Sequence, residues 1–362
     1  MKSQSKVKKV LKIVRNTLLI LLGLIVLFVL GTFVVHNILL SGERDLLTEG
    51  GYVNSVSAGD YNLNIYLYGN EDAEHTIVGL SGMGSTDYAV EIKSVTDNLA
   101  DENRIAIVDR AGYGLSDDTT KEQTIEQIIS DYRTALKNAG CEAPYILMCH
   151  SIGGVYATYW ANTYPDEIEA IIYLDPTQIG SIEFLEEDED WNATTQEFVE
   201  AVACHLGLQR VFYSPFSDVP ESLKEYDMAY WWNNTYSLAM YSEKNLVKEN
   251  IAKTYNLMQP NDIPKLYIDA NPYTKEDFLE MVAYLNRQLE LTGQEQIEMT
   301  DEYINQVWTE TAAQNFYNQS IKPYIDKLGN CTYVNIPGDH FIFMHKPDEV
   351  TKTCKDFLDT LK

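Results

Sequence analysis

A serine that closes a short apolar run is the residue of this chain best suited to act as a nucleophile. Ser151 follows the run 145–149 and is itself followed by Ile152, Gly153 and Gly154. A strand that turns sharply into a helix forces its turn residue into strained backbone geometry, and only small flanking residues permit that turn. We therefore interpret Ser151 as a candidate nucleophile whose hydroxyl projects over a sheet edge.

His340 is the predicted base for this serine. A serine hydroxyl is a poor nucleophile at neutral pH, and it needs a base within hydrogen-bonding distance that a carboxylate orients. His340 directly follows the last predicted strand, 331–336, so it would lie on a loop at the same sheet edge as Ser151. The other histidines are less well placed: His36, His75, His150, His205 and His345.

The elements that would position these residues alternate between β-type and helical runs. A hairpin is predicted over 50–68, around 58–60. Such alternation is typical of the α/β class, with a mainly parallel sheet covered by helices on both faces. The predicted strands are 76–80, 104–108, 145–149, 170–174, 263–269 and 331–336. The predicted helices are 88–100, 125–139, 152–162, 276–291, 301–319 and 349–361.

The N-terminal segment has the composition of a membrane anchor. Residues 1–16 carry six Lys or Arg and no acid, and the nineteen residues 17–35 carry no charge. As a helix, the uncharged stretch spans roughly 28 Å, about the hydrocarbon thickness of a bilayer. Lysines on its N-terminal side favour a cytoplasmic N-terminus and an extracytoplasmic domain. No A-x-A-like site follows the stretch, so we expect an uncleaved anchor rather than a signal peptide.

The remaining residues are strongly acidic. Subtracting the six N-terminal bases from the chain's 27 leaves 21 against 54 acidic residues, a net charge of −33. This charge would repel phosphate backbones and argues against nucleic acid as a partner. No Cys or His spacing of the metal-binding type is present, and we expect no metal and no organic cofactor.

Two helical insertions interrupt the alternation, and they set the predicted divisions of the chain. These divisions are a basic cytoplasmic tail, 1–16; a transmembrane anchor, 17–36; a linker, 37–49; the first part of the core, 50–177; a helical cap, 178–260; and the second part of the core, 261–362, with a further helical insertion at about 274–321.

Four motifs together resemble the α/β-hydrolase superfamily, in its cap-bearing serine hydrolase branch. The segment 149–153, Cys-His-Ser-Ile-Gly, is similar to the family's small-x-Ser-x-Gly elbow. Residues 109–117 look like its Asp-Arg-x-Gly-x-Gly-x-Ser loop, and 338–340 with 347–350 resemble its histidine loop and final helix. The likeness covers about residues 50–177 and 261–362, and the serine distinguishes the chain from dehalogenases and epoxide hydrolases of this fold, which use an aspartate there.

The resemblance also implies an oxyanion hole and an acid. The backbone N–H groups of Met83, in the loop 81–84, and of Ile152 would face the oxygen that gains charge. The family's usual acid follows the strand at 265–268, where this chain has Asp269 and where Tyr273 falls at the expected carboxylate position. Asp175, at the end of the strand after the nucleophile helix, is the preferred acid. Asp269 and then Glu276 or Asp277 are alternatives, and a site with no acid stays open.

The expected activity is that of a membrane-anchored serine hydrolase cleaving an ester or similar acyl bond. Aromatic residues in the cap, such as Trp191, Phe198, Tyr236 and Tyr241, favour a small-molecule substrate with an apolar acyl or alkyl part. The lipid bilayer would be the second partner. A peptidase or a carbon–carbon bond hydrolase would use the same triad, and a non-catalytic binding or signalling protein on a hydrolase scaffold is the alternative of another class.

Overall fold

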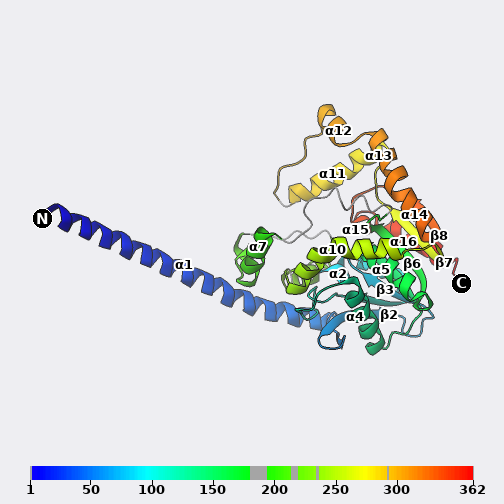
Figure 1. The fold of residues 1–362 in the computed structure, drawn as a ribbon, viewed down its shortest axis with the longest axis horizontal. Helices are drawn as coiled ribbons and strands as arrows, with labels where there is room; N and C mark the ends of the chain where they lie inside the picture. The colour runs from blue at the N-terminus through cyan, green and yellow to red at the C-terminus, as the bar shows by residue number, and fades with distance from the viewer. Residues whose placement is uncertain (1, 180–193, 213–218, 234–235, 292, 362) are drawn as a thin grey trace.

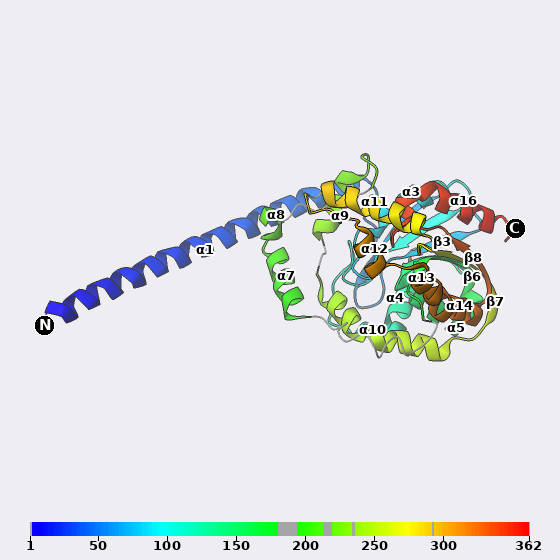
Figure 2. The same cartoon turned by 90° about the horizontal axis from the view of Figure 1, so that it is seen from above.

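An eight-stranded sheet forms the centre of the molecule, with a long N-terminal helix projecting from it (Figure 1). The computed structural model describes residues 2–361 apart from 180–193, 213–218, 234–235 and 292. Trp191, one of the aromatic residues that the sequence analysis placed in the cap, lies outside the described residues. Seen from above, the helices α4, α5 and α10 lie on one side of the sheet and α3 and α16 on the other (Figure 2).

The sheet has the order β1-β2-β4-β3-β5-β6-β7-β8, and it confirms the predicted α/β fold. The pairs β1–β2 and β2–β4 are antiparallel, and every later pair is parallel. The strands are β1 (Ser55–Ser57), β2 (Asn62–Gly69), β3 (Thr76–Leu80), β4 (Arg104–Val108), β5 (Tyr145–Ser151), β6 (Ile168–Pro176), β7 (Asn261–Asp269) and β8 (Gly329–Asn335).

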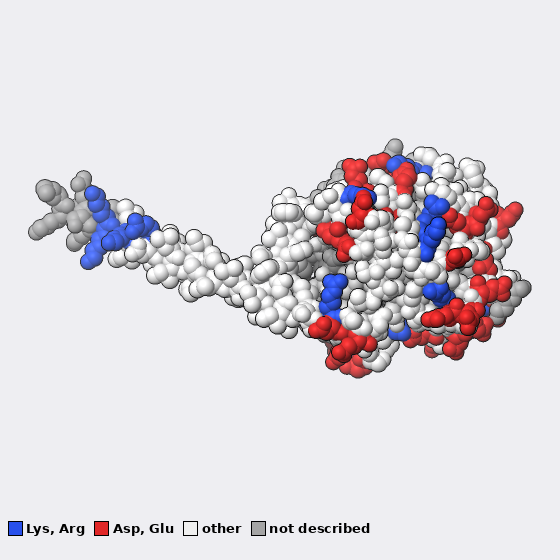
Figure 3. All heavy atoms as spheres, turned by 90° about the horizontal axis from the view of Figure 1, so that it is seen from below, with Lys and Arg blue, Asp and Glu red and all other residues white. Residues whose placement is uncertain are grey.

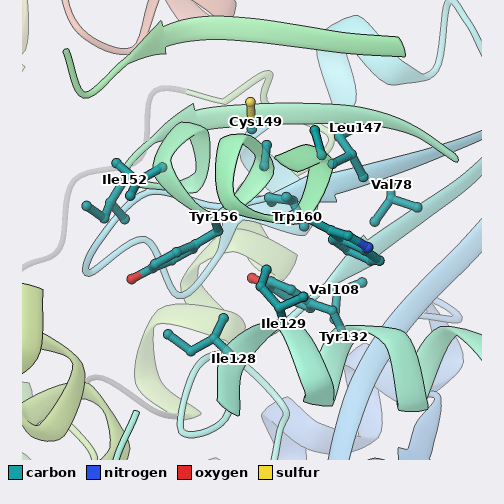
Figure 4. Close-up of a cluster of buried hydrophobic side chains, with 14 of the residues drawn as sticks. Val78, Val108, Ile128, Ile129, Tyr132, Leu147, Cys149, Ile152, Tyr156 and Trp160 are labelled. Atoms are coloured by element: carbon teal, nitrogen blue, oxygen red, sulfur yellow. The ribbon is translucent and has the colours of Figure 1, made fainter. Parts of the chain in front are cut away.

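Apolar residues of the central strands alternate between the two faces of the sheet. Leu147 of β5 packs with α4 (Ile125–Asn138) and α5 (Gly153–Thr163), whereas Met148 packs on the opposite face with α16 (Pro347–Leu358). Trp160 of α5 is fully buried and stacks on Tyr132 of α4 with ring centroids 6.1 Å apart (Figure 4). Burial on both faces is what makes these strands nearly continuous apolar runs.

The described part of the predicted cap, 178–260, is helical. It contains α7 (Thr195–His205), α8 (Gln209–Phe212), α9 (Lys224–Asn233) and α10 (Leu238–Leu257). The second insertion contains α11 (Lys275–Leu291), α12 (Asp301–Val307), α13 (Glu310–Phe316), a π-helical turn (Tyr317–Ile321) and α14 (Lys322–Leu328). Short helices α2 (Tyr88–Glu91), α3 (Lys93–Thr96) and α15 (Ile342–His345) complete the core.

The N-terminal helix α1 (Lys2–Glu49) is longer than the predicted anchor. It runs without interruption through residues 37–49, which were predicted as a linker. The end of α1 is held because Leu47 is fully buried and Glu43 pairs with Arg210 of α8 at 2.6 Å. Within the described residues, α1 is the one helix whose length and composition would allow it to cross a membrane, and its apolar window is not buried.

Candidate active site

Ser151 lies at a strained turn between β5 and α5. Its φ is +53°, a left-handed conformation that is costly for a residue with a Cβ. The two glycines that follow are required by packing: a Cβ on Gly153 would lie 2.4 Å from the carbonyl oxygen of Leu80, and one on Gly154 would lie 2.5 Å from the Cβ of Pro176. The turn therefore holds a half-buried serine at the carboxyl end of the central strand, as predicted.

Asp175 lies at the end of β6, the strand next to β5, and contacts His340. Its Oδ2 is 2.6 Å from His340 Nδ1, and its Oδ1 accepts a hydrogen bond from the Ala270 backbone N–H at 3.0 Å. Asp175 also has a positive φ, +43°. The Asp175 side chain is 11% exposed and that of His340 is 48% exposed. A carboxylate is thus positioned to fix the orientation of an accessible imidazole.

The loop that carries His340 is tied to the residue before Ser151. His150 is buried, and its Nε2 donates to the backbone carbonyl of His340 at 3.0 Å. The two imidazole rings are 4.5 Å apart between centroids. Burial, and then the nearby His340, lower the pKa of His150 to about 3, so its ring is neutral at physiological pH. Ser151 at the end of β5, Asp175 near the end of β6 and His340 in the loop after β8 therefore lie at the same edge of the sheet.

Asp269, the alternative acid, has its carboxylate occupied elsewhere. Its Oδ2 accepts from the hydroxyls of Tyr273 and Tyr333, each at 2.7 Å, and its Oδ1 accepts from the backbone N–H of Asn271 at 3.0 Å. Burial removes water from this carboxyl and raises its pKa, and this effect outweighs the hydrogen bonds, which lower the pKa. Tyr273, at the position where the family's acid was expected, donates to Asp269.

The other alternative acids, the exposed Glu276 and the half-buried Asp277, lie on the first turn of α11. Asp277 accepts from the hydroxyl of Thr274 at 2.6 Å, which is a local cap of that helix. Of the four carboxylates considered, Asp175 is the one hydrogen-bonded to His340 in the described structure.

The predicted oxyanion loop packs directly against the Ser151 turn. A Cβ on Gly82 would lie 3.2 Å from the Ser151 Cβ and 2.9 Å from His150 Nδ1. Only a glycine lets the loop come this close. Ile152 is buried at the start of α5, and Met83 is half-buried. The loop is thus close enough for its backbone to share a ligand with the serine.

Arg110 holds this loop in place; the sequence analysis placed it in the motif 109–117 but gave it no role. It donates to the carbonyl oxygens of Ser81 at 2.7 Å and Gly82 at 2.8 Å, and to the Ser81 hydroxyl at 3.0 Å. The peptide bond between Gly82 and Met83 is trans, so its N–H points opposite to its C=O. Anchoring the Gly82 carbonyl on Arg110 therefore directs the Met83 N–H away from the guanidinium.

A buried ion pair connects Arg110 to the cap. Arg110 Nη2 is 3.3 Å from Oε1 of Glu243 on α10, and both side chains are only 2% exposed. The Tyr156 hydroxyl donates to Glu243, and the guanidinium lies 4.1 Å from the Tyr113 ring centroid. A pair buried this deeply is stable only when its remaining polar atoms are also satisfied. The cap helix and the oxyanion loop are therefore fixed to each other.

A cavity of about 220 Å³ opens beside the loop. Lys244 and Glu197, the two charged residues in the described lining, form an ion pair, so their charges cancel. The hydrogen bond from Lys244 lowers the pKa of Glu197. Two of the predicted cap aromatics line the cavity, whereas Phe198 points to solvent. The lining residues are Met83, Gly84, Tyr113, Glu197, Tyr236, Met240, Tyr241 and Lys244.

Across the part of the chain that the structure describes, no three His, Cys, Asp or Glu side chains are grouped so that they could hold a metal ion.

Comparison with known proteins relates the chain to a family of hydrolases. Residues 71–259, slightly more than half of the chain, match the model of the family described as serine aminopeptidase, S33 (Hydrolase_4). The uncharacterized protein YbdG of Bacillus subtilis (strain 168) is 29% identical over 357 residues, which are 97% of each chain. The uncharacterized protein C23C11.06c of Schizosaccharomyces pombe is 26% identical over 65% of this chain and 42% of its own length.

Solved structures share the fold. The epoxide hydrolase CorEH has a TM-score of 0.55 and 17% identity, and the match covers 85% of this chain and 99% of the enzyme. The haloalkane dehalogenase DatA from Agrobacterium tumefaciens C58 also has a TM-score of 0.55, with 16% identity over 85% of this chain and 96% of its own. At this identity, the likeness concerns the architecture alone.

Proposed function

The chain belongs to the serine aminopeptidase S33 family of α/β-hydrolases, and from this membership and the site we propose that it is a serine hydrolase of ester or related acyl bonds. The observation that carries the proposal is the 2.6 Å contact between Asp175 and His340 at the sheet edge where Ser151 occupies a strained turn. A serine, an imidazole and an orienting carboxylate are the groups that acyl transfer requires.

The proposed reaction has two halves. His340 Nε2 removes the hydroxyl proton of Ser151 as the serine oxygen attacks the substrate carbonyl, and the negative charge moves to the carbonyl oxygen. The N–H groups of Met83 and Ile152 stabilise that oxygen, each such donor contributing about 2.7–4 kcal/mol to lowering the barrier. His340 then protonates the leaving alcohol, and an acyl group remains on Ser151. Water, deprotonated by His340, releases the acid and restores the serine.

An ester with an apolar acyl or alkyl part is favoured over a peptide. An aminopeptidase must bind the charged amino terminus of its substrate, and a free carboxylate in the cavity would serve that purpose. Glu197 is the carboxylate in the described lining, and it is already paired with Lys244. Glu243, close behind Tyr113, is paired with Arg110. The cavity is therefore better matched to an uncharged group, while a carbon–carbon bond hydrolase remains the second candidate.

We further propose that α1 anchors the protein in a membrane. The apolar side chains over 17–35 are exposed, which is stable in lipid but not in water. The Lys and Arg residues before them favour an N-terminus in the cytoplasm and the hydrolase domain outside it.

A panel of chromogenic esters of rising acyl length tests the proposed activity. The full-length protein in detergent is assayed with these esters and with aminoacyl anilides, beside the Ser151→Ala variant. We expect turnover of the esters that the variant lacks. A preference for aminoacyl anilides would favour a peptidase, and no turnover of either class would favour the non-catalytic scaffold.

A further inference from the structure

The cap helix α7 has two faces of opposite character. Ala201 and Cys204 are buried, and Glu197 on the same side lines the cavity. The outer face carries Phe198 and Val199, 61% and 60% exposed, and Val202, 44% exposed. Val202 comes four residues after Phe198 and three after Val199, so its side chain is a neighbour of both on the helix surface. Three apolar side chains therefore form a continuous exposed strip.

The cap lies against the part of α1 that is proposed to be in the membrane. Gly207, which follows α7, touches α1 so closely that a Cβ on it would lie 2.6 Å from the Thr32 carbonyl oxygen. Arg210 of α8 donates to His36 Nδ1 at 2.7 Å. Thr32 lies three residues before the end of the uncharged stretch 17–35, roughly 5 Å inside it. Cap residues thus reach the depth of the hydrocarbon boundary.

A groove between α1 and α8 extends this apolar region. It has a volume of about 440 Å³, and Val211 of α8, 51% exposed, is part of its wall. The α1 residues that line it are Leu27, Phe28, Gly31, Thr32, Val35 and Leu39. The groove therefore extends the exposed apolar surface of α1 onto α8, the helix that follows α7 in the chain.

The views of the molecule agree with this placement. In Figures 1 and 2, α7 lies on the side of the domain that is nearest the free length of α1. On the face shown in Figure 3, acidic side chains are spread over the domain, including a cluster where α1 joins it, whereas the middle of α1 is uncharged. An exposed apolar strip in a cap that contacts a candidate membrane-spanning helix suits a protein whose cap lies on a bilayer.

We propose that Phe198, Val199 and Val202, together with Val211, insert into the outer leaflet beside α1, so that the cap itself is a membrane-binding element. This inference rests on the proposed anchor. Because α7 carries the strip on one face and the cavity residue Glu197 on the other, the helix separates the bilayer from the cavity beside Met83. The substrate class that this arrangement fits is an amphiphilic lipid ester that reaches the site from the leaflet.

Photolabelling in vesicles tests the docking without depending on turnover. The full-length protein is reconstituted into phosphatidylcholine vesicles containing a phospholipid with a diazirine in its acyl chain, and labelled peptides are measured by mass spectrometry. We expect label on α1, on α7 and on α8, which carries Val211. Phe198→Ser combined with Val199→Ser and Val202→Ser should lower the label on α8 by about 5-fold or more, as lost apolar insertion predicts, with the label on α1 unchanged. Leu291→Ser, at an apolar residue of α11 that is 71% exposed, is the control and should change the label on neither helix.

The outcomes separate the docking from the anchor and from catalysis. Label on α1 without label on α7 would overturn the docking and leave the anchor intact, whereas label on neither helix would overturn both. The triple variant should also hydrolyse a soluble short-chain ester at the wild-type rate but lose about 10-fold or more on a long-chain ester embedded in vesicles. Equal rates of the variant and the wild type on the embedded ester would contradict delivery from the leaflet.

Discussion

Asp175 and Asp269 end neighbouring strands, yet their carboxylates have different surroundings. The Asp175 carboxylate accepts hydrogen bonds from the His340 ring and from one backbone N–H, and its side chain is 11% exposed. Asp269 is fully buried, and its carboxylate accepts hydrogen bonds from two tyrosine hydroxyls and from the backbone N–H of Asn271. The first arrangement can hold an imidazole in one tautomer during turnover, and the second supports the ends of β7 and β8. We therefore assign the acid of the proposed triad to Asp175.

Replacing each aspartate by asparagine should separate these two roles. Asp175→Asn should lower kcat by about 10⁴-fold, because the imidazole of His340 would adopt the wrong tautomer, with little change in melting temperature. Asp269→Asn should leave kcat near the wild-type value and lower the free energy of unfolding by about 1–3 kcal/mol, because buried hydroxyls would lose an acceptor. Steady-state kinetics and thermal unfolding of both variants measure this. The reverse pattern would assign the acid to Asp269.

The reactive residues could be predicted to different extents. Ser151 was predicted from the glycines that permit a sharp turn. In the structure its backbone has the strained conformation that such a turn requires, with φ at +53°. Asp175 could only be ranked above Asp269, because two adjacent strand ends offer the same pattern and the direction of each side chain depends on tertiary packing. Glu243 carried no signal, since it is 133 residues from Arg110 in the sequence.

At the scale of elements, α10 acts on the oxyanion loop through Arg110. The guanidinium joins Glu243 of α10 to two loop carbonyls, and one of these shares its peptide with the Met83 N–H. The position of a cap helix therefore determines the direction of a backbone donor. This arrangement makes Arg110 and Glu243 positioning residues rather than groups that touch the substrate.

Glu243→Gln tests this connection because it keeps the side-chain shape and removes the charge. Arg110 would be left as an unpaired buried cation, and we expect a loss of about 3–5 kcal/mol in the free energy of unfolding. In the protein that remains folded, kcat should fall with little change in KM, because the Met83 donor acts mainly in the transition state. Glu249→Gln, on the exposed side of the same helix, is the matched control. A fall in stability with an unchanged kcat would show a purely structural role.

The order of the elements was predictable, and their exact lengths were less so. All six predicted strands and the hairpin are present, because buried parallel strands are short apolar runs bounded by polar turns. The predicted helix 88–100 is instead two short helices, α2 and α3, that meet at Ile92. The Thr96 hydroxyl donates to the Ile92 carbonyl, a local contact that competes with helix continuation. Helix α1 extends beyond its prediction because its last turns pack on the domain.

At the scale of the whole molecule, charge and hydropathy are divided between the domain and α1. The chain beyond residue 16 has a net charge of −33, while α1 is basic at its start and apolar along its middle. Because the last turns of α1 pack against α9, with Leu47 buried, the hydrolase domain has no flexible spacer. We therefore expect the domain to lie close to the membrane surface.

Protease treatment of intact producing cells tests the proposed topology. The domain should be cleaved from outside, whereas a cytoplasmic marker protein in the same cells stays intact. A variant in which Lys8, Lys9 and Lys12 are changed to Gln should show weaker retention of the N-terminus in the cytoplasm, because these bases set the orientation. A domain that is protected until the cells are lysed would contradict an extracytoplasmic location.

Labelling with a fluorophosphonate probe is the most direct test of the activated serine. The probe reacts only with a serine whose proton is removed by a neighbouring base. We predict one labelled peptide in the wild-type protein, with the probe on Ser151, and none in Ser151→Ala, with strongly reduced labelling in His340→Ala. Equal labelling of the wild type and Ser151→Ala, or no labelling of the wild type, would contradict the account.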